Sequence, residues 1–549
     1  MEFARRTHRL MWIAAVGWIA AALFGPRAVA GTTVHTEYPL FTVSGQLLKW
    51  QPDDLAVLTS ACIFAHGRFE PEDRKAAREM NPDFIFLTYI NRAKVYLPAP
   101  AAELGADWLR DLLYYRAGVL AQAVDAQATT LRLEQADGPI ALRASVKPLG
   151  QASGYDVWLR MGEELMRVEA WDKQTGQATV SRGFAGTKPE AHAASDGAFT
   201  PILSQRESLG GRGEGGPRYI FDPAGVTRWK LTLQDSLEAV EAGADGVWLD
   251  LVSSDPLRPA TATGALAAAW WDFEQEKPYT PDRFREASEW GLNYLQNEYR
   301  KAKGQWPIVY ANNMGKISDY DIGSGGRAEF LRSTQIKPRP LDGYCIEGFA
   351  GMVGGSAEFF TGGARRGGAS PVRKTGYESW REKTALLARA AQEGLAACPM
   401  ICNAGVATQT FERATQAQKD DFESWAYASY LLCVERKDGR CPTPLGVPFM
   451  RWEGDTRRVA LHPRYSWPVG DPAETKPWDK LDEYCPAGHA TYVRHFAHGV
   501  ALVNPTSEAD SGVPLGRDYT DPESGETMQA VDMPAQTGRI LLAPDAPTA

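Results

Sequence analysis

The sequence predicts an α/β fold, a (β/α)₈ barrel of the TIM type that carries an inserted small β module and a C-terminal antiparallel β-sandwich. Short apolar runs recur along the chain, and each ends in a small cluster of polar or glycine residues. Stretches with the period of amphipathic helices separate these runs. Strands that alternate with helices are typical of parallel βα units, and seven or eight such units close most simply into a barrel.

The expected barrel strands are the short apolar runs themselves. We place them at 61–65, 83–87, 219–221, 246–249, 308–310, 344–346 and 400–402, with an eighth between Tyr430 and Trp452. Helix-like stretches lie between them, for example at 232–242 and 281–303. The first of these leads directly into Gly243-Ala244-Asp245-Gly246, so that a helix stop is followed at once by a strand.

Two segments break this alternation. From 118 to 201 the chain has short strand-like runs with turns and almost no helical period, which predicts a β module inserted into the barrel. From 486 to 549, alternating residues punctuated by Gly, Asn and Pro predict an antiparallel sandwich that packs on the barrel. The barrel itself is then expected from residues 31–117 and 202–485.

The first thirty residues, 1–30, have the features of a secretory signal peptide. A basic start, an apolar middle and a small-x-small cleavage pattern are found at Arg5, Arg6 and Arg9, at 11–24 and at Ala28-Val29-Ala30. We therefore expect a secreted or periplasmic protein whose mature chain starts near Gly31. An uncleaved anchor is the alternative, but the apolar run is shorter than the ~20 residues that span a bilayer.

The composition narrows the class of partner. The net charge is −9 and no basic tract is present, so the electrostatic footprint of a nucleic-acid-binding or anionic-lipid-binding protein is missing. The 17 tryptophans offer flat aromatic faces that suit sugar rings, although tryptophan also fills large cores. We expect a carbohydrate substrate, no nucleic acid, and no membrane insertion once the signal peptide is removed; the sequence does not indicate an oligomeric state.

Cysteine and histidine spacing predicts neither a metal site nor another cofactor. None of the seven cysteines stands in a CxxC pair, and no His/Asp/Glu spacing resembles a metal site. Cys433 and Cys441 are close enough in the chain to close a short disulfide loop in an oxidising compartment. Buried free thiols are expected at the cysteines in or beside apolar runs, which are Cys62, Cys345, Cys398 and Cys402.

Two carboxylates directly follow expected strands. Asp250 ends the run Gly246-Val247-Trp248-Leu249-Asp250, and Glu347 ends Tyr344-Cys345-Ile346-Glu347, two strands later. Active sites of (β/α)₈ enzymes are built at the C-terminal ends of the strands, so both residues are expected at the barrel mouth. The alternatives are a helix N-cap or solvated loop for Asp250, and a buried carboxylate paired with a barrel arginine for Glu347. As a pair, they match the two carboxylates that glycoside hydrolysis requires.

Other polar residues that follow expected strands are suited to holding sugar hydroxyls. They are His66 and Arg68 after the first strand, Tyr89 and Asn91 after the second, Asp222 after the third, Asn312 and Asn313 after the fifth, and Asn403 after the seventh. Each of these residue types is also common in turns or as a satisfied core group, and Asp222-Pro223 has the composition of a turn. A nucleophilic serine is not indicated, because the GxSxG pattern is absent.

The chain resembles glycoside hydrolases with a (β/α)₈ barrel that are distantly related to the α-galactosidase and endo-α-polygalactosaminidase groups. The segments that carry this resemblance are Gly243 to Asp250, Tyr310-Ala311-Asn312, Gly343 to Glu347 and Asn504-Pro505. It covers roughly residues 50–116 and 202–545, and implies that the aspartate of strand four is the nucleophile and the acid of strand six the proton donor. These roles correspond to Asp250 and Glu347, although many relatives of the α-galactosidases carry aspartate as the second acid.

The inserted segment has a resemblance of its own. Residues 179–187, followed by Ala191-His192-Ala193, look like a small β module of phage tail-type and surface proteins, which implies adhesion or spacing.

These observations predict a secreted, two-carboxylate glycosidase that cleaves O-glycosidic bonds of a poly- or oligosaccharide, and they favour a retaining mechanism. A non-catalytic glycan-binding or surface-attachment protein on a barrel scaffold is the alternative, because a fold does not fix a function. A carbohydrate deacetylase or lyase fits less well, since metal ligands and an obvious Lys or His base are missing from the sequence pattern.

Overall fold

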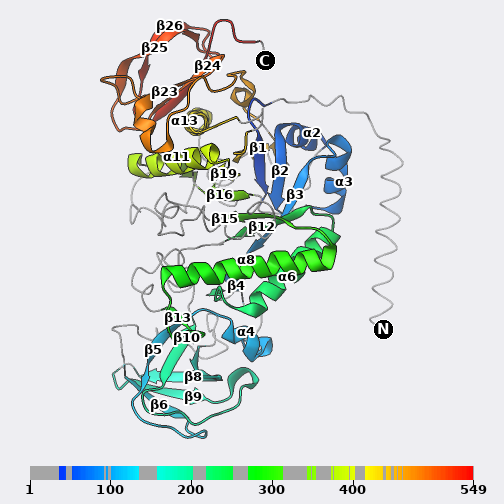
Figure 1. The fold of residues 1–549 in the computed structure, drawn as a ribbon, viewed down its shortest axis with the longest axis vertical. Helices are drawn as coiled ribbons and strands as arrows, with labels where there is room; N and C mark the ends of the chain where they lie inside the picture. The colour runs from blue at the N-terminus through cyan, green and yellow to red at the C-terminus, as the bar shows by residue number, and fades with distance from the viewer. Residues whose placement is uncertain are drawn as a thin grey trace.

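The computed structural model places a barrel between two β sheets, with the C-terminal sheet at one end of the molecule and a second sheet at the other (Figure 1). It describes residues 36–44, 52–67, 69–91, 94–96, 101–134, 157–172, 174–201, 218–250, 270–312, 343–347, 349–353, 372–374, 376–394, 396–401, 415–436, 441–446, 450–453, 456–459 and 461–547.

Eight parallel strands close the barrel, which confirms the predicted fold class. In their order around the barrel they are β1 (Leu40–Ser44), β2 (Cys62–Gly67), β3 (Ile85–Asn91), β12 (Gly246–Asp250), β15 (Ile308–Asn312), β16 (Gly343–Glu347), β19 (Ala397–Met400) and β20 (Leu445–Gly446). The eighth strand, which was expected between Tyr430 and Trp452, is therefore β20.

One predicted barrel strand was wrong and one barrel strand was missed, so the numbering of the strands from the fourth onward is unchanged. The run at 219–221 is not a barrel strand, because β11 (Arg218–Ile220) pairs antiparallel with β4 (Lys94–Tyr96) in a separate two-stranded sheet. The first barrel strand is instead β1, which the alternation of strands and helices did not reveal. Asp250 and Glu347 consequently still end the fourth and sixth strands of the barrel.

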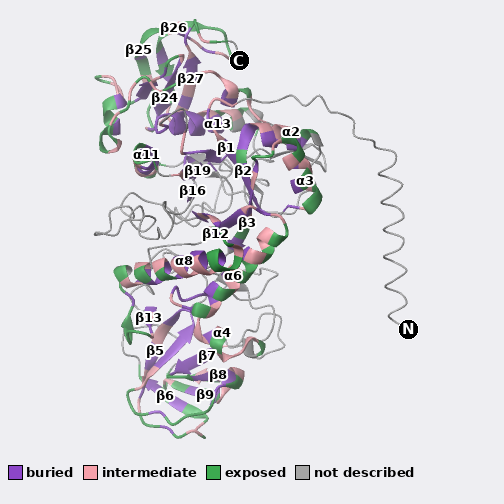
Figure 2. Cartoon of the chain, turned by 45° about the vertical axis from the view of Figure 1, so that its right-hand side comes forward, coloured by how far each residue is buried: buried purple, intermediate pink, exposed green. Residues whose placement is uncertain are grey.

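Helices connect the strands and cover the barrel. They include α2 (Pro52–Ala61), α3 (Pro71–Met80), α6 (Val226–Glu241), α8 (Pro281–Lys303), α11 (Tyr377–Gln392) and α13 (Gln416–Leu431). The expected helix at 281–303 has the predicted bounds because its ends are well marked: the Thr280 side chain accepts a hydrogen bond from the Arg283 backbone, and Gly304 has a φ of 73°. Buried residues gather on the barrel strands and on the inner sides of the helices (Figure 2).

The inside of the barrel is filled by side chains. Phe41 and Phe64 stack at a centroid distance of 4.8 Å, and Trp248 lies against both rings. Leu87, Cys345, Cys398 and Met400 complete this apolar cluster. The barrel is therefore a packed core and not a pore, and only the residues beyond this cluster at the strand ends can contact a substrate.

The inserted segment forms an eight-stranded sheet. Its order is β10 (Gly197–Pro201), β7 (Trp158–Met161), β8 (Glu164–Asp172), β9 (Gln177–Ser181), β6 (Thr130–Glu134), β5 (Tyr114–Leu120), β13 (Trp270–Asp272) and β14 (Lys277–Pro278). The last two strands come from outside the predicted 118–201 segment. They belong to the connection between β12 and α8, and β13 joins the sheet by pairing with β5.

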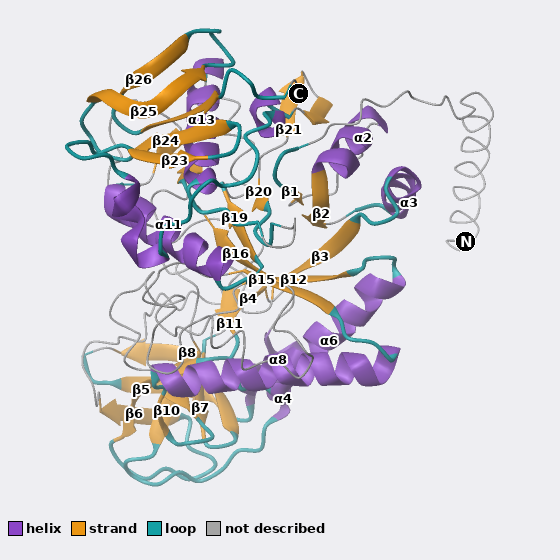
Figure 3. Cartoon of the chain, turned by 45° about the horizontal axis from the view of Figure 1, so that its top comes forward, coloured by secondary structure: helices purple, strands orange, loops and turns teal. Residues whose placement is uncertain are grey.

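Connectivity puts this sheet on the C-terminal side of the barrel. Strands β4 to β11 lie between β3 and α6, and β13 and β14 lie between β12 and α8. Both connections leave the C-terminal end of a barrel strand, which is the end that carries active sites in this fold. Figure 3 shows α6 and α8 running between the barrel strands and the inserted sheet. The module is thus connected to the same end of the barrel at which Asp250 and Glu347 lie.

The segment that resembles phage tail-type modules folds around a buried carboxylate. Glu164 is fully buried and accepts hydrogen bonds of 2.7 Å from both the Nε and the Nη2 of Arg182. His192 Nε2 lies 2.9 Å from the same carboxylate, and the backbone amide of Glu190 donates to it. This pattern of residues is accordingly a structural clamp of the module.

The C-terminal strands form the predicted β-sandwich. The strands are β23 (Tyr492–His495), β24 (Gly499–Asn504), β25 (Asp510–Thr520), β26 (Thr527–Met533) and β27 (Thr537–Leu542). β25 meets β27 only at Thr520 and Leu542, so the β25–β26 hairpin folds over the other strands and encloses a core that includes Val500, Val513 and Leu541. Gly538 of β27 packs closely on α13, where an added Cβ would lie 2.7 Å from the Trp425 Cα.

The signal peptide, the absence of a membrane span and the disulfide were also expected from the sequence. The predicted signal peptide lies outside the described residues, and within those residues no helix has the length and apolar character to cross a membrane. Cys433 and Cys441, suggested as a disulfide, are both free thiols. Burial raises the pKa of the Cys433 thiol, which contacts the carbonyl oxygens of Thr384 and Ser429.

Candidate functional site

Asp250 and Glu347 occupy equivalent positions at the barrel mouth. Each is the last residue of its strand, β12 and β16, and one strand, β15, lies between them. Neighbouring strands are ~4.8 Å apart, so the two backbone positions are separated by roughly 10 Å around the rim. This separation is within reach of two carboxylates that act on one bond.

The two positions also share the inward register. Trp248, two residues before Asp250, and Cys345, two residues before Glu347, both belong to the cluster inside the barrel. Because successive residues of a strand alternate between its faces, the backbone positions of Asp250 and Glu347 have the same register as Trp248 and Cys345. Asn312 follows the same rule, two residues after Tyr310, which packs against the cluster. Three neighbouring strands therefore end in Asp, Asn and Glu.

His66 lies in the same layer on the other side of Trp248. Its exposed fraction is 4%, and its ring stacks on the Trp248 indole with the centroids 4.1 Å apart. Within the described part of the chain neither ring nitrogen has a hydrogen-bond partner. Burial lowers the pKa of His66 to about 3, so the imidazole is neutral at physiological pH and presents one donor and one acceptor.

Aromatic rings extend this layer to both sides. Trp248 also stacks on Tyr310, with the ring planes 6° apart. Tyr89, on β3, lies 6.4 Å from His66 and is 37% exposed. Of these rings, Tyr89 is exposed at the mouth and suits the face of a sugar ring, whereas Trp248 is 1% exposed and belongs to the barrel interior beneath His66. The sequence analysis selected His66 and Tyr89, and the structure adds that Trp248 supports the His66 ring from inside the barrel.

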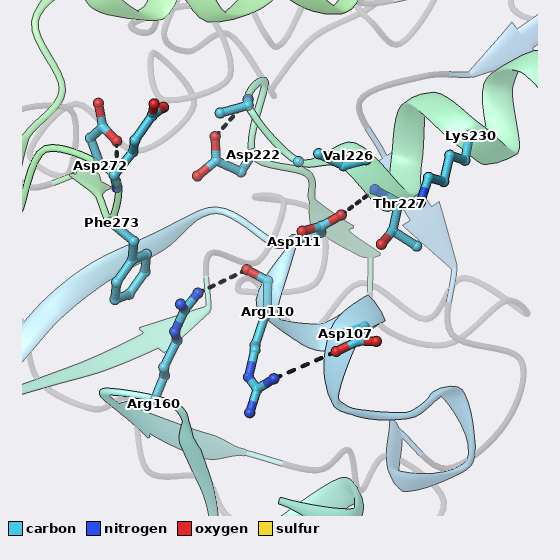
Figure 4. Close-up of a pocket in the computed structure, with 13 residues that line it drawn as sticks. Asp107, Arg110, Asp111, Arg160, Asp222, Val226, Thr227, Lys230, Asp272 and Phe273 are labelled. Carbon is cyan, nitrogen blue, oxygen red and sulfur yellow. Dashed lines mark hydrogen bonds and ion pairs between the residues drawn. The ribbon is translucent and has the colours of Figure 1, made fainter.

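Asp222 lies away from the barrel mouth, which corrects its expected place after a third barrel strand. It follows β11, outside the barrel, and borders a cavity of about 410 Å³ between the inserted sheet and the start of α6 (Figure 4). Tyr279 donates its hydroxyl to Asp222 Oδ1 at 2.6 Å, and the Ala224 backbone donates to the same oxygen at 2.9 Å. Burial raises the pKa of Asp222 to about 7.

Of the remaining predicted site residues, the structure describes the backbone of two. Asn91 and Asn312 end their strands in the backbone, as Asp250 and Glu347 do. Arg68, Asn313 and Asn403 lie outside the described residues. The described His, Cys, Asp and Glu side chains include no group of three or more arranged to hold a metal ion.

Comparisons with known proteins concern the fold. No protein-family model and no curated protein matches the sequence. Among solved structures, the glycoside hydrolase domain of PelA from Pseudomonas aeruginosa is similar with a TM-score of 0.35 and 11% identity, over 75% of this chain and 95% of that one. Eubacterium rectale Amy13B has a TM-score of 0.40 and 10% identity, over 93% and 97% of the two chains. A debranching enzyme of Nostoc punctiforme has a TM-score of 0.40 and 10% identity, over 93% and 100%.

Proposed function

We propose that this chain is an exported glycoside hydrolase that cleaves O-glycosidic bonds of a poly- or oligosaccharide with Asp250 and Glu347 as its catalytic carboxylates. The single observation that carries the proposal is that Asp250 and Glu347 end barrel strands four and six. Both are in the register of the residues that form the apolar cluster inside the barrel. Two carboxylates at one mouth are the requirement of this chemistry. The neutral imidazole of His66 and the exposed ring of Tyr89 offer hydrogen-bonding groups and an apolar face for the sugar.

The proposed reaction has two steps. Asp250 attacks the anomeric carbon, the bond from that carbon to the leaving oxygen breaks, and Glu347 gives its proton to that oxygen. Glu347 then takes a proton from water, whose oxygen attacks the anomeric carbon and releases Asp250. This retaining course requires carboxyl groups ~5–5.5 Å apart, whereas ~6.5–9.5 Å would make room for water and invert the configuration. The product anomer seen first by proton NMR distinguishes the two courses, and we expect retention.

The catalytic assignment is tested with a panel of polysaccharides and aryl glycosides on the wild type, Asp250→Asn and Glu347→Gln. Each variant should lose at least a hundredfold in kcat, because each removes one half of the acid and nucleophile pair. Asp83→Asn is a matched control, since Asp83 is exposed and precedes β3 at the opposite end of the barrel. Unchanged turnover in both carboxylate variants would refute the assignment. Binding of a glycan without turnover by the wild type would support a binding protein on a barrel scaffold.

A further inference from the structure

The cavity beside Asp222 is built jointly by the inserted module and the barrel. Arg160 of β7 and the turn Asp272 to Glu274 line it from the module. The end of α4 (Ala106–Arg110) and Asp111 also belong to the inserted connection, and the first turns of α6 line the cavity from the barrel side. Helix α6 begins on the C-terminal side of the barrel, as does the connection that holds Asp272. The cavity is thus on the same side of the molecule as Asp250 and Glu347, and its 410 Å³ is large enough for a sugar ring.

Many charges around the cavity are already paired within the protein. Asp272 accepts a hydrogen bond of 2.8 Å from Arg283. Arg160 donates to the Arg110 carbonyl at 3.0 Å, and its guanidinium covers the Phe273 ring at 3.6 Å. Arg110 pairs with Glu163 at 3.2 Å. These groups form the walls, and the Phe273 face that Arg160 covers is not free for stacking.

Three polar groups keep capacity for a ligand. Asp222 is 9% exposed and uses only Oδ1 for its bonds to Tyr279 and Ala224; no described residue donates to Oδ2. Figure 4 shows the second oxygen of Asp222 on the side of the carboxyl group that lies toward Asp272 and Phe273. Asp111 accepts from the backbone amide and the side chain of Thr227, which is fewer than the roughly four hydrogen bonds that a carboxylate can accept. Lys230, exposed on α6, forms no ion pair with any residue that the structure describes.

The charges of the side chains that line the cavity determine which ligand charge it can accommodate. Asp222 and Asp111 would repel an anion, while the nearby Lys230 opposes a cation, and the other charged groups of the lining are paired within the protein. Burial that keeps Asp222 protonated up to about pH 7 further reduces the negative charge. What remains is a set of directional donors and acceptors with little net charge, which is the environment that hydroxyl groups require.

We propose that this cavity is a carbohydrate subsite that binds one neutral sugar ring through Asp222, Asp111 and Lys230. The ring belongs to the chain whose bond is cleaved at Asp250 and Glu347, so in this respect the subsite rests on the proposed function. It assigns the inserted module a part in substrate binding, because the module closes one wall of the cavity.

Hydrogen exchange of the full exported chain, read by mass spectrometry, tests the subsite. The probes are methyl glucoside, glucosamine and glucuronate, which share a ring and differ in charge, at equal concentration and ionic strength. We expect methyl glucoside to protect the peptide that covers residues 222–230, and glucuronate to leave it unprotected. Absence of protection by methyl glucoside, or protection by glucosamine alone, would overturn the proposal.

Two variants locate the binding in the cavity. Asp222→Asn and Lys230→Gln should each raise the concentration of methyl glucoside needed for protection at least fivefold, while Asp235→Asn, an equal change on the exposed part of α6, should not. Lys230 is exposed, so its variant should fold even if Asp222→Asn does not. Equal protection in the wild type and Lys230→Gln would contradict the assignment.

One further variant separates this proposal from the catalytic one. Asp250→Asn should lose hydrolysis and keep the protection of residues 222–230. Protection without hydrolysis in the wild type would leave the subsite intact and remove the proposed function. Hydrolysis by the wild type without protection of residues 222–230 would support the proposed function and remove the subsite.

Discussion

The imidazole of His66 and the indole of Trp248 lie face to face at the barrel mouth, 4.1 Å apart and 14° from parallel. This contact buries a titratable ring against an apolar one, and therefore ties the protonation of His66 to the stability of the barrel. Asp222, at the cavity of the inserted module, is tied to stability in the opposite sense. The two residues make pH a sensitive probe of both sites.

We expect His66→Phe to flatten the pH dependence of unfolding in acid. Burial lowers the pKa of His66 from 6.5 to about 3, so between these values the unfolded chain binds the proton and the folded chain does not. The His66 contribution to stability is then complete above pH 6.5 and is lost as the pH falls toward 3, with a limiting slope of about 1.4 kcal/mol per pH unit. Phenylalanine keeps the stacked ring without the titration. Urea unfolding at pH 5 and pH 7 measures the slope, and an identical slope in both proteins would contradict the burial of a neutral His66.

Asp222→Asn should change the pH dependence with the other sign. The pKa of Asp222 is raised from 3.8 to about 7, so the folded chain binds the proton more tightly and stability falls as the pH rises between these values. The asparagine side chain has an oxygen that can accept from Tyr279, and it does not ionise. We expect the variant to gain stability relative to the wild type at pH 8 compared with pH 5, as measured by urea unfolding. A constant difference between the two proteins at both pH values would argue against the raised pKa.

Glu164→Gln should destabilise the inserted module by about 3 kcal/mol, because it leaves the buried guanidinium of Arg182 without its charged partner. Hydrogen exchange of the peptides between residues 164 and 192 should accelerate, which locates the loss in the module. The exposed Glu169, which pairs with Arg167 at 3.8 Å, is the matched position, and Glu169→Gln should stay within about 0.5 kcal/mol of the wild type. Equal effects of the two substitutions would refute the clamp.

Gly291→Ala should destabilise the chain by about 1–3 kcal/mol, although alanine favours helices more than glycine does. A Cβ at Gly291 of α8 would lie 1.8 Å from the Trp229 ring of α6. Trp229 cannot move away cheaply, since it is fully buried and its Nε1 donates to the Pro223 carbonyl at 2.9 Å. Thermal unfolding measures the loss, and Glu298→Ala on the same helix controls for the helix itself. A stabilised Gly291→Ala would show that α6 and α8 are not packed this closely.

Local pattern was enough to predict much of the barrel. The α8 helix could be predicted to the residue because Thr280, Pro281 and Gly304 mark its ends chemically. The strand ends at Asp250 and Glu347 could be predicted because an apolar run followed by a carboxylate is itself a local signal. The position of β1 was not predicted, and the first expected barrel strand was placed at 61–65 instead.

The sequence by itself determined that βα units repeat and that two carboxylates follow the strands which became the fourth and sixth of the barrel. Tertiary structure alone decided that β11 pairs with β4, that β13 joins the sheet of the inserted module, and that Asp222 therefore borders a cavity away from the barrel mouth. The physical reason is that apolar period and capping are encoded by neighbours in the chain, whereas the partner of a short strand is chosen by whichever distant edge satisfies its backbone hydrogen bonds.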